Sequence, residues 1–227
     1  MNIQSTILGI LFSIISFSVL SQSKTEFDLK DFKSIDVGGA FYIEISQGDQ
    51  YSVTLECEED LLDKIDIHLS GEKLKISIKG RSSSKEQPKV SITMPNLVKL
   101  EVSGASIVKL TGLNVESMDV EISGASELQG DLNINEINID ASGASTIGLS
   151  GKANKLNLYL SGASSFNGKG FLITDEFLAD FSGASSAYCQ VDGDMFLKMT
   201  GASSLSYHGE GSILKQETSG ASSISKD

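Results

Sequence analysis

Histidine and cysteine, which often carry out chemistry, are sparse in this sequence with two of each, and the possible catalytic or metal-binding residues are not grouped at the spacings that such sites need. His68 and His208 are the two histidines, and neither has a cysteine or acidic residue at a recognisable ligand spacing. Serines are numerous, but a nucleophilic serine also needs a general base and a strained turn, which the sequence does not supply. We therefore predict no catalytic residue, no cofactor and no metal site, and we expect that the protein is not an enzyme.

The acidic run Glu58-Glu59-Asp60 is the one cluster whose carboxylates could bind a cation such as calcium. A solvated turn is the favoured interpretation of this run. Solenoids built from calcium-binding nonapeptides carry an aspartate inside each glycine-rich repeat. The repeats of this chain have alanine and serine at that place instead.

A tetrapeptide, Ser-Gly-Ala-Ser, recurs along the C-terminal two-thirds of the chain. Successive glycines of the tetrapeptide are 18 to 21 residues apart. A period of this length is typical of a stacked repeat protein, in which each unit contacts only its neighbours. The copies begin at Ser103, Ser123, Ser142, Ser161, Ser182, Thr200 and Ser219.

Apolar and polar residues alternate on both sides of each tetrapeptide, which is the pattern of a strand with one buried face. Leu100 and Val102 precede the first copy, and Val108 and Leu110 follow it. A third apolar pair closes some units, so that each unit holds three short strands and no helical stripe. The pattern predicts an all-β fold: a right-handed parallel β-helix, that is, a three-sided β-solenoid with coils of about 19 residues and a less regular N-terminal β region.

The tetrapeptide is predicted to form the corner of each coil. Glycine permits the positive φ that a sharp corner demands, alanine avoids the collision that a larger inward side chain would make, and the serines bond to neighbouring backbone groups. The alternative is that the serines form a flat, exposed, hydroxyl-lined binding strip. The residues expected in the corner ladder are Gly104, Gly124, Gly143, Gly162, Gly183, Gly201 and Gly220, with Ala105, Ala125, Ala144, Ala163, Ala184, Ala202 and Ala221.

The composition divides the chain into three parts. Residues 1–23 contain an apolar run of signal-peptide length and are predicted to be a signal peptide, with an uncleaved N-terminal anchor as the alternative. In residues 24–97 apolar and polar residues alternate, but the tetrapeptide is absent. These residues are predicted to form irregular starting coils or a cap, with a separate small β-domain as the alternative. Residues 98–227 are the regular repeats. About ten coils at ~4.8 Å each would give a rod of roughly 50 Å.

The net charge of −12 argues against a nucleic-acid partner. Cys57 and Cys189 both fall at inward positions of their strands and are expected to be buried free thiols rather than a disulfide. We expect a monomer with no transmembrane anchor in the mature chain.

Several segments together resemble the head GIN domain family of auto-transporter adhesins. They are Val37-Gly38-Gly39-Ala40 with the strand that follows it, the strand from Leu74 to Ile78, Met94-Pro95-Asn96-Leu97, and the series of Ser-Gly-Ala-Ser corners. The resemblance covers residues 30–222. It implies a right-handed β-helix and an exported protein of the cell envelope, and it brings no established catalytic residue.

Two classes of function remain. The first is a non-enzymatic exported protein of the periplasm, the outer surface or the medium that binds a surface, a glycan or a protein through a flat side of the solenoid. The second is a carbohydrate-active β-helix enzyme such as a polysaccharide lyase or hydrolase, which is supported by analogy of fold alone. Short, uniform coils leave little room for a catalytic cleft, so the first class is favoured.

Overall fold

The computed structural model describes residues 22–80 and 87–227. The predicted signal peptide lies outside the described residues except for its last two positions. The described residues form seventeen strands and one short 3-10 helix, and all the strands belong to one continuous hydrogen-bonded sheet. No helix among these residues has the length and apolar character needed to cross a membrane.

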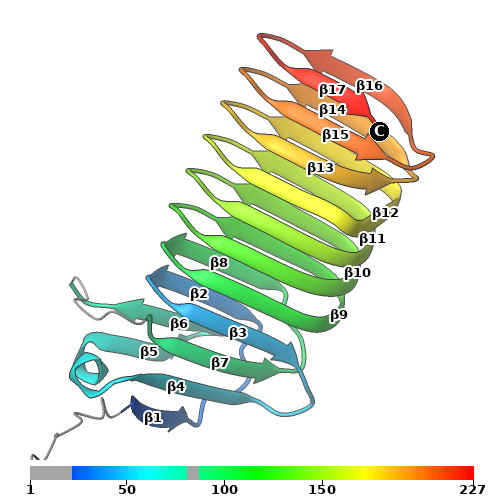
Figure 1. The fold of residues 1–227 in the computed structure, drawn as a ribbon. Helices are drawn as coiled ribbons and strands as arrows, with labels where there is room; N and C mark the ends of the chain where they lie inside the picture. Colours follow the sequence, from blue (N-terminus) through cyan, green and yellow to red (C-terminus); the bar gives the residue numbers. More distant parts are fainter. Residues whose placement is uncertain (1–21, 81–86) are drawn as a thin grey trace, which may run out of the picture.

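The C-terminal part is a column of parallel coils (Figure 1). Four coils are each one long, bent strand: β9 (Ile107–Ile122), β10 (Glu127–Ala141), β11 (Thr146–Leu160) and β12 (Ser165–Phe181). The next coils are divided into two strands each, and the last strand lies at the open end of the column. These strands are β13 (Ser186–Val191), β14 (Asp194–Met199), β15 (Ser204–His208), β16 (Ser212–Thr218) and β17 (Ser223–Lys226).

Each long strand buries three separate runs of apolar side chains. In β9 the first run is Val108 and Leu110, the second is Leu113 and Val115, and the third begins at Met118. Two exposed residues stand between successive runs, and there the chain turns a corner. The coil therefore has three faces, and the prediction of a three-sided parallel β-helix with coils of about 19 residues is confirmed.

The N-terminal region follows a different order in space from its order in sequence. The strands β2 (Ser34–Gly39) and β3 (Tyr42–Gln47) form a coil that lies between two others. On one side it pairs in parallel with β6 (Lys73–Ile78) and β7 (Lys89–Met94), and on the other with β8 (Lys99–Gly104) and β9. The earliest coil in the sequence is thus an interior coil of the stack.

Three further strands close the N-terminal end of the stack by antiparallel pairing. These are β1 (Gln22–Phe27), β4 (Ser52–Glu58) and β5 (Ile65–Ser70), with the 3-10 helix η1 (Glu59–Lys64) between the last two. The described solenoid has about seven turns. The expectation of about ten coils was wrong because residues 48–72 form antiparallel strands and a helix at the N-terminal end of the stack instead of coils of their own.

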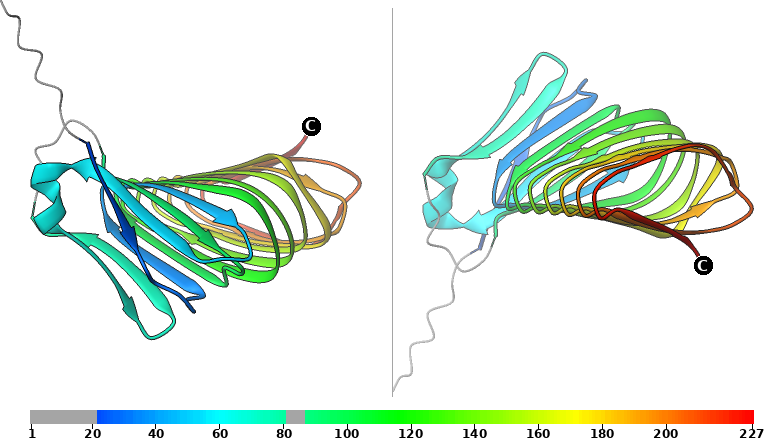
Figure 2. Two further views of the ribbon diagram at one scale, coloured as in Figure 1. Left: turned by 90° about the horizontal axis from the view of Figure 1, so that it is seen from below. Right: turned by 90° about the horizontal axis from the view of Figure 1, so that it is seen from above.

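One apolar core runs through the whole molecule, from Phe32 and Phe41 to Leu205. Seen from below and from above, the coils follow one another in order along the column (Figure 2). Cys57 and Cys189 are buried in this core and are free thiols, as predicted. Burial raises the pKa of both thiols, and the effect is larger for the fully buried Cys189.

Candidate binding surface

The corner glycines stack directly over one another. Gly143 has a φ of 75°, and a Cβ atom built on it would lie 2.5 Å from the carbonyl oxygen of Gly124 in the preceding coil. The same relation holds at each step from Gly39 to Gly220. Gly38-Gly39-Ala40 therefore forms a corner in register with the first tetrapeptide, because Gly39 pairs with Gly104.

The corner alanines do not point inward, and the expectation that they do was wrong. Each alanine side chain in the seven tetrapeptides is exposed. The backbone N–H of each alanine instead donates a hydrogen bond of 2.7–2.8 Å to the corner glycine carbonyl of the preceding coil. The positive φ of the glycine reverses the inward and outward alternation of the side chains that follow it. The alanine therefore faces outward and the second serine faces inward.

The second serine of each inner tetrapeptide is buried. Ser145, for example, is 1% exposed, and its Oγ donates a 2.8 Å hydrogen bond to the carbonyl oxygen of Ser142. The same bond to the residue three positions earlier forms in the other coils from Ser126 onward. The buried members of this series, Ser106 to Ser203, cannot belong to an exposed hydroxyl strip, because their side chains lie inside the coil.

The outer surface of the third face of the solenoid carries two straight columns of side chains, and we call this surface the groove face. It is formed by β6, β2, β8, the last parts of β9 to β12, β14 and β16. The parallel register places the members of each column one strand apart. The first column is Lys73, Ser34, Lys99, Asp119, Asn138, Asn157, Leu178, Phe196 and Lys215. The second column is Lys75, Asp36, Glu101, Glu121, Asp140, Tyr159, Asp180, Lys198 and Glu217.

Two hollows lie between these columns. The first has a volume of about 200 Å³ and is lined by Asp119 and Asn138 on one side and by Glu121, Asp140 and Tyr159 on the other. Tyr159 is 41% exposed, and it is one of two large hydrophobic side chains that are exposed among residues 22–80 and 87–227.

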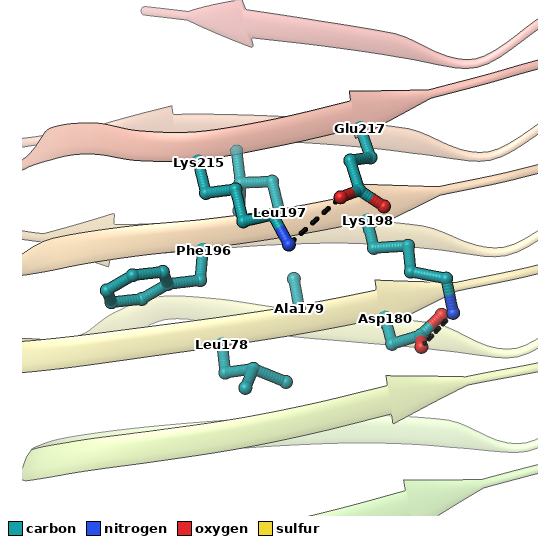
Figure 3. A pocket seen from close by; sticks show the side chains of 8 residues that line it. All are labelled: Leu178, Ala179, Asp180, Phe196, Leu197, Lys198, Lys215 and Glu217. Carbon is teal, nitrogen blue, oxygen red and sulfur yellow. Dashed lines mark hydrogen bonds and ion pairs between the residues drawn. The ribbon is translucent and has the colours of Figure 1, made fainter.

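The second hollow has a volume of about 190 Å³ and lies further along the same groove (Figure 3). Leu178, Phe196 and Lys215 stand on one side of it, and Asp180, Lys198 and Glu217 stand on the other. A third hollow, of about 290 Å³, runs along the edge of the groove face, where the second column meets Ser103, Ser123 and Ser142.

Charge is distributed unevenly along the groove face. Glu101 is paired with Lys73 and Lys99, and the hydrogen bond from Lys73 lowers the pKa of its carboxyl group. Lys99 also contacts Glu121 at 2.7 Å, and this bond raises the pKa of the lysine. Among the residues that the structure describes, Asp140 has no ion-pair partner. The first hollow is therefore acidic.

The second hollow is electrically balanced. Lys198 Nζ lies 2.8 Å from Asp180 Oδ2, and Lys215 Nζ lies 2.9 Å from Glu217 Oε1 (Figure 3). The hydrogen bond that Lys198 donates to Asp180 raises the pKa of the lysine, and the bond from Lys215 lowers the pKa of Glu217. Two positive and two negative side chains thus surround an apolar wall formed by Leu178 and Phe196.

A further hollow, of about 420 Å³, lies on the second face. Hydrogen bonds join three of its side chains: Asn135 Nδ2 donates to Glu116 Oε1 at 3.0 Å, and Asn154 Nδ2 donates to Asn135 Oδ1 at 2.8 Å. These bonds between successive coils give Glu116, Asn135 and Asn154 a structural explanation.

The fold separates the other residues that the sequence singled out for possible chemistry. His68 contacts Asp66 on β5, whereas His208 contacts the Tyr188 hydroxyl at 3.2 Å near the other end of the column. Glu58 ends β4, and Glu59 and Asp60 begin η1. Within residues 22–80 and 87–227, no group of three or more His, Cys, Asp or Glu side chains is arranged to hold a metal ion.

Sequence reasoning missed the groove face, although a signal for it was present. Tyr159, Leu178 and Phe196 occupy positions that the alternation assigns to the outside of the coil, where most other residues are polar. A single outward apolar residue is ordinary, but such residues on three successive strands are typical of an interaction surface.

Residues 31–211 match the family described as "Putative auto-transporter adhesin, head GIN domain". The chain belongs to this family. The resemblance noted in the corner and strand segments is confirmed, and the family match spans the N-terminal region as well as most of the regular coils of the head GIN domain. A search of curated proteins finds no match.

Solved structures share the head GIN fold with low sequence identity. One from Bacteroides fragilis NCTC 9343, described as a putative adhesin, has a TM-score of 0.79 and 19% identity, covering 91% of this chain and 97% of the other. A putative adhesin from Parabacteroides merdae ATCC 43184 has a TM-score of 0.70 and 15% identity, covering 91% and 96%. A protein from Parabacteroides distasonis ATCC 8503 described as a putative lipid binding protein has a TM-score of 0.71 and 14% identity, covering 91% and 96%.

Proposed function

We propose that this head GIN protein is an exported, non-catalytic binding protein of the cell envelope that attaches to a surface, a glycan or another protein through its groove face. The family and its structural neighbours support an adhesive role. The observation that carries the proposal is that three hollows lie on one face, between or beside two straight columns of side chains.

The arrangement of carboxylates makes the enzyme alternative the weaker one. Glycoside hydrolases place two carboxyl groups on opposite sides of the scissile bond. On the groove face, Glu101, Glu121 and Asp140 instead follow one another in a single column, and the first two contact lysines. Asp119 faces this column across the first hollow, but it already accepts a 2.8 Å hydrogen bond from Asn138, so the arrangement offers rows of hydrogen-bond acceptors.

The location of the protein follows from the same proposal. We place it in the periplasm, on the outer surface or in the medium, with residues 1–23 removed as a signal peptide, residues 24–97 closing the solenoid and residues 98–227 forming the regular coils. Intact-mass measurement of the exported protein checks the cleavage. Protease treatment of intact cells distinguishes the surface from the periplasm.

A single substitution on each of two faces tests the binding role. Asn138→Arg places a large cation in the groove, where it can pair with Asp119, which already accepts a 2.8 Å bond from Asn138. Asn133→Arg makes the same change at an exposed position of the second face. Binding of fluorescent protein to envelope material from the producing cells is expected to weaken about tenfold for Asn138→Arg alone. Equal binding by both variants and the unmodified protein would exclude the groove face.

A further inference from the structure

We propose that the groove between the two columns binds a linear, uncharged glycan that lies along the solenoid axis, across the strands. This inference rests on the proposed function and names the ligand class of the same surface. It follows from the direction of the groove, the side chains that line it and the sign of its charge.

The direction of the groove excludes the usual mode of extended peptide binding. The two hollows are bounded by the same two columns, which run at right angles to the strands from Asp119 to Glu217. A peptide in β conformation binds by adding a strand at a sheet edge, where backbone groups are unpaired. On the groove face the backbone groups of each inner strand are paired with both neighbours, so a ligand there must be recognised by side chains alone.

The side chains of the groove suit a ligand with both C–H and hydroxyl groups. Tyr159 presents an exposed aromatic surface, and Leu178 and Phe196 form an apolar wall on the next two strands along. Aromatic side chains supply large contact areas in binding sites and, for tyrosine, a polar group as well. A pyranose ring has C–H groups on its faces and hydroxyls at its rim. The rim hydroxyls can donate to Asp180 or Asp140 and accept from Asn138 or Lys198.

The charge of the groove selects an uncharged glycan over an acidic one. In the second hollow the Asp180–Lys198 and Lys215–Glu217 pairs leave no net charge. The first hollow carries the carboxylates of Asp119, Glu121 and Asp140, and the whole chain carries −12. A polymer of uronic acids would meet repulsion along this surface.

Affinity electrophoresis of the mature chain tests the inference. The gels contain soluble neutral polymers, namely laminarin, galactomannan and hydroxyethyl cellulose, or polygalacturonate as the acidic comparison. The variants are Tyr159→Ala and Phe196→Ala on the groove face. The matched control is Tyr188→Ala, an aromatic residue of β13 on the first face. Thermal unfolding of every variant is measured in parallel, and Tyr159→Trp and Phe196→Trp serve as variants that keep an aromatic surface.

We expect at least one neutral polymer to retard the protein, with binding weakened about tenfold in Tyr159→Ala and Phe196→Ala. The Tyr188→Ala and tryptophan variants are expected to stay near the unmodified protein, and polygalacturonate is expected not to retard any of them. The inference is overturned if no neutral polymer retards the protein, if polygalacturonate binds more strongly, or if Tyr188→Ala matches the groove variants.

These results can be told apart from failure of the proposed function. If Asn138→Arg weakens binding to envelope material while no neutral polymer binds, the groove face is a binding surface for a protein or another ligand, and only the glycan is wrong. If Asn138→Arg has no effect on that binding, the proposed function itself is wrong.

Discussion

The backbone N–H of Ala144 donates a 2.8 Å hydrogen bond to the carbonyl oxygen of Gly124, and this bond links one corner to the corner of the preceding coil. The same oxygen lies 2.5 Å from the position that a Cβ atom on Gly143 would occupy, which is too close for a side chain there. The Ala144 hydrogen bond brings the Gly124 oxygen close to Gly143, and only a residue without a side chain at position 143 leaves room for that approach. The corner residue is thus constrained by its neighbour in the stack as well as by its own φ.

Gly143→Ala is expected to destabilise the protein more than Gly112→Ala. Both glycines have positive φ, 75° for Gly143 and 63° for Gly112, but a Cβ atom on Gly112 would meet no atom within 4 Å. The control therefore measures the conformational cost alone, about 1–2 kcal/mol. Urea denaturation should show an additional loss of about 2 kcal/mol for Gly143→Ala. Equal losses would mean that the stack can open at little cost.

Ser145→Ala removes a buried hydroxyl that bonds to the Ser142 carbonyl, and it should lower the free energy of unfolding by about 1 kcal/mol. Ser186→Ala is the control, since Ser186 is exposed at the start of β13. This control should change stability by less than about 0.5 kcal/mol. If the two variants unfolded at the same urea concentration, the inward serines would have no part in stabilising the corner.

Leu158→Ala and Tyr159→Ala change adjacent residues that point to opposite sides of β11. Leu158 is fully buried, so its truncation should cost about 2–5 kcal/mol of stability. Tyr159 faces the groove and is 41% exposed, so its truncation should leave the unfolding transition nearly unchanged. Denaturation midpoints measured by circular dichroism compare the two. A large loss in Tyr159→Ala would mean that the residue supports the fold and does not serve a surface role.

The Glu101 pairs should make stability depend on pH in the acidic range. Lys73 and Lys99 lower the pKa of Glu101 from its ordinary value of 4.5 in the folded state. The unfolded chain therefore takes up the proton at a higher pH than the folded chain does. The contribution is fully present above pH 4.5 and is lost as the pH falls through the lowered pKa. Because the side chain is partly exposed, it amounts to less than about 1 kcal/mol.

Glu101→Gln measures this contribution directly. The difference in unfolding free energy between the unmodified protein and this variant should be largest near neutral pH and should shrink below pH 4.5. Glu217→Gln removes a carboxylate from an exposed pair and should show a smaller effect that disappears in high salt. A difference that grows as the pH falls would contradict the lowered pKa of Glu101.

Both cysteines should resist alkylation while the protein is folded. Burial raises the pKa of the two thiols, and Cys57 and Cys189 are 5% and 0% exposed. Iodoacetamide at a mildly alkaline pH should leave the native protein unmodified and add two groups after denaturation without reductant. A mass two hydrogens lower, with no alkylation, would show a disulfide instead.

The repeated part of the fold was predictable because one tetrapeptide fixes both the period and the corner. Gly38-Gly39-Ala40 resembles a degenerate corner in the sequence, and Gly39 pairs with Gly104 as that interpretation requires. The place of β2 and β3 in the stack was not predictable. A two-residue alternation shows which side chains are buried, but the same pattern suits parallel strands and the antiparallel pair of β4 and β7.

The direction of the corner alanines was also missed, for a local reason. Alternation assumes extended backbone, and each corner glycine departs from it with a positive φ. The groove face could be found only in part from the sequence. The outward position of Phe196 is visible in the alternation of β14. Its alignment with Leu178 in the preceding coil could not be predicted, because the coils differ in length by a few residues.

The place of β2 and β3 between β6–β7 and β8–β9 has a consequence for how the protein acquires its shape. As the chain emerges from its N-terminus, this first coil has both edges free until residues 73–94 cover one and residues 99–122 cover the other. Assembly of the column in the order of the sequence therefore cannot advance in a single direction from one end. Assembly in that order would start from an inner coil, add coils on both sides of it and add the C-terminal coils last, when the N-terminal end is already covered.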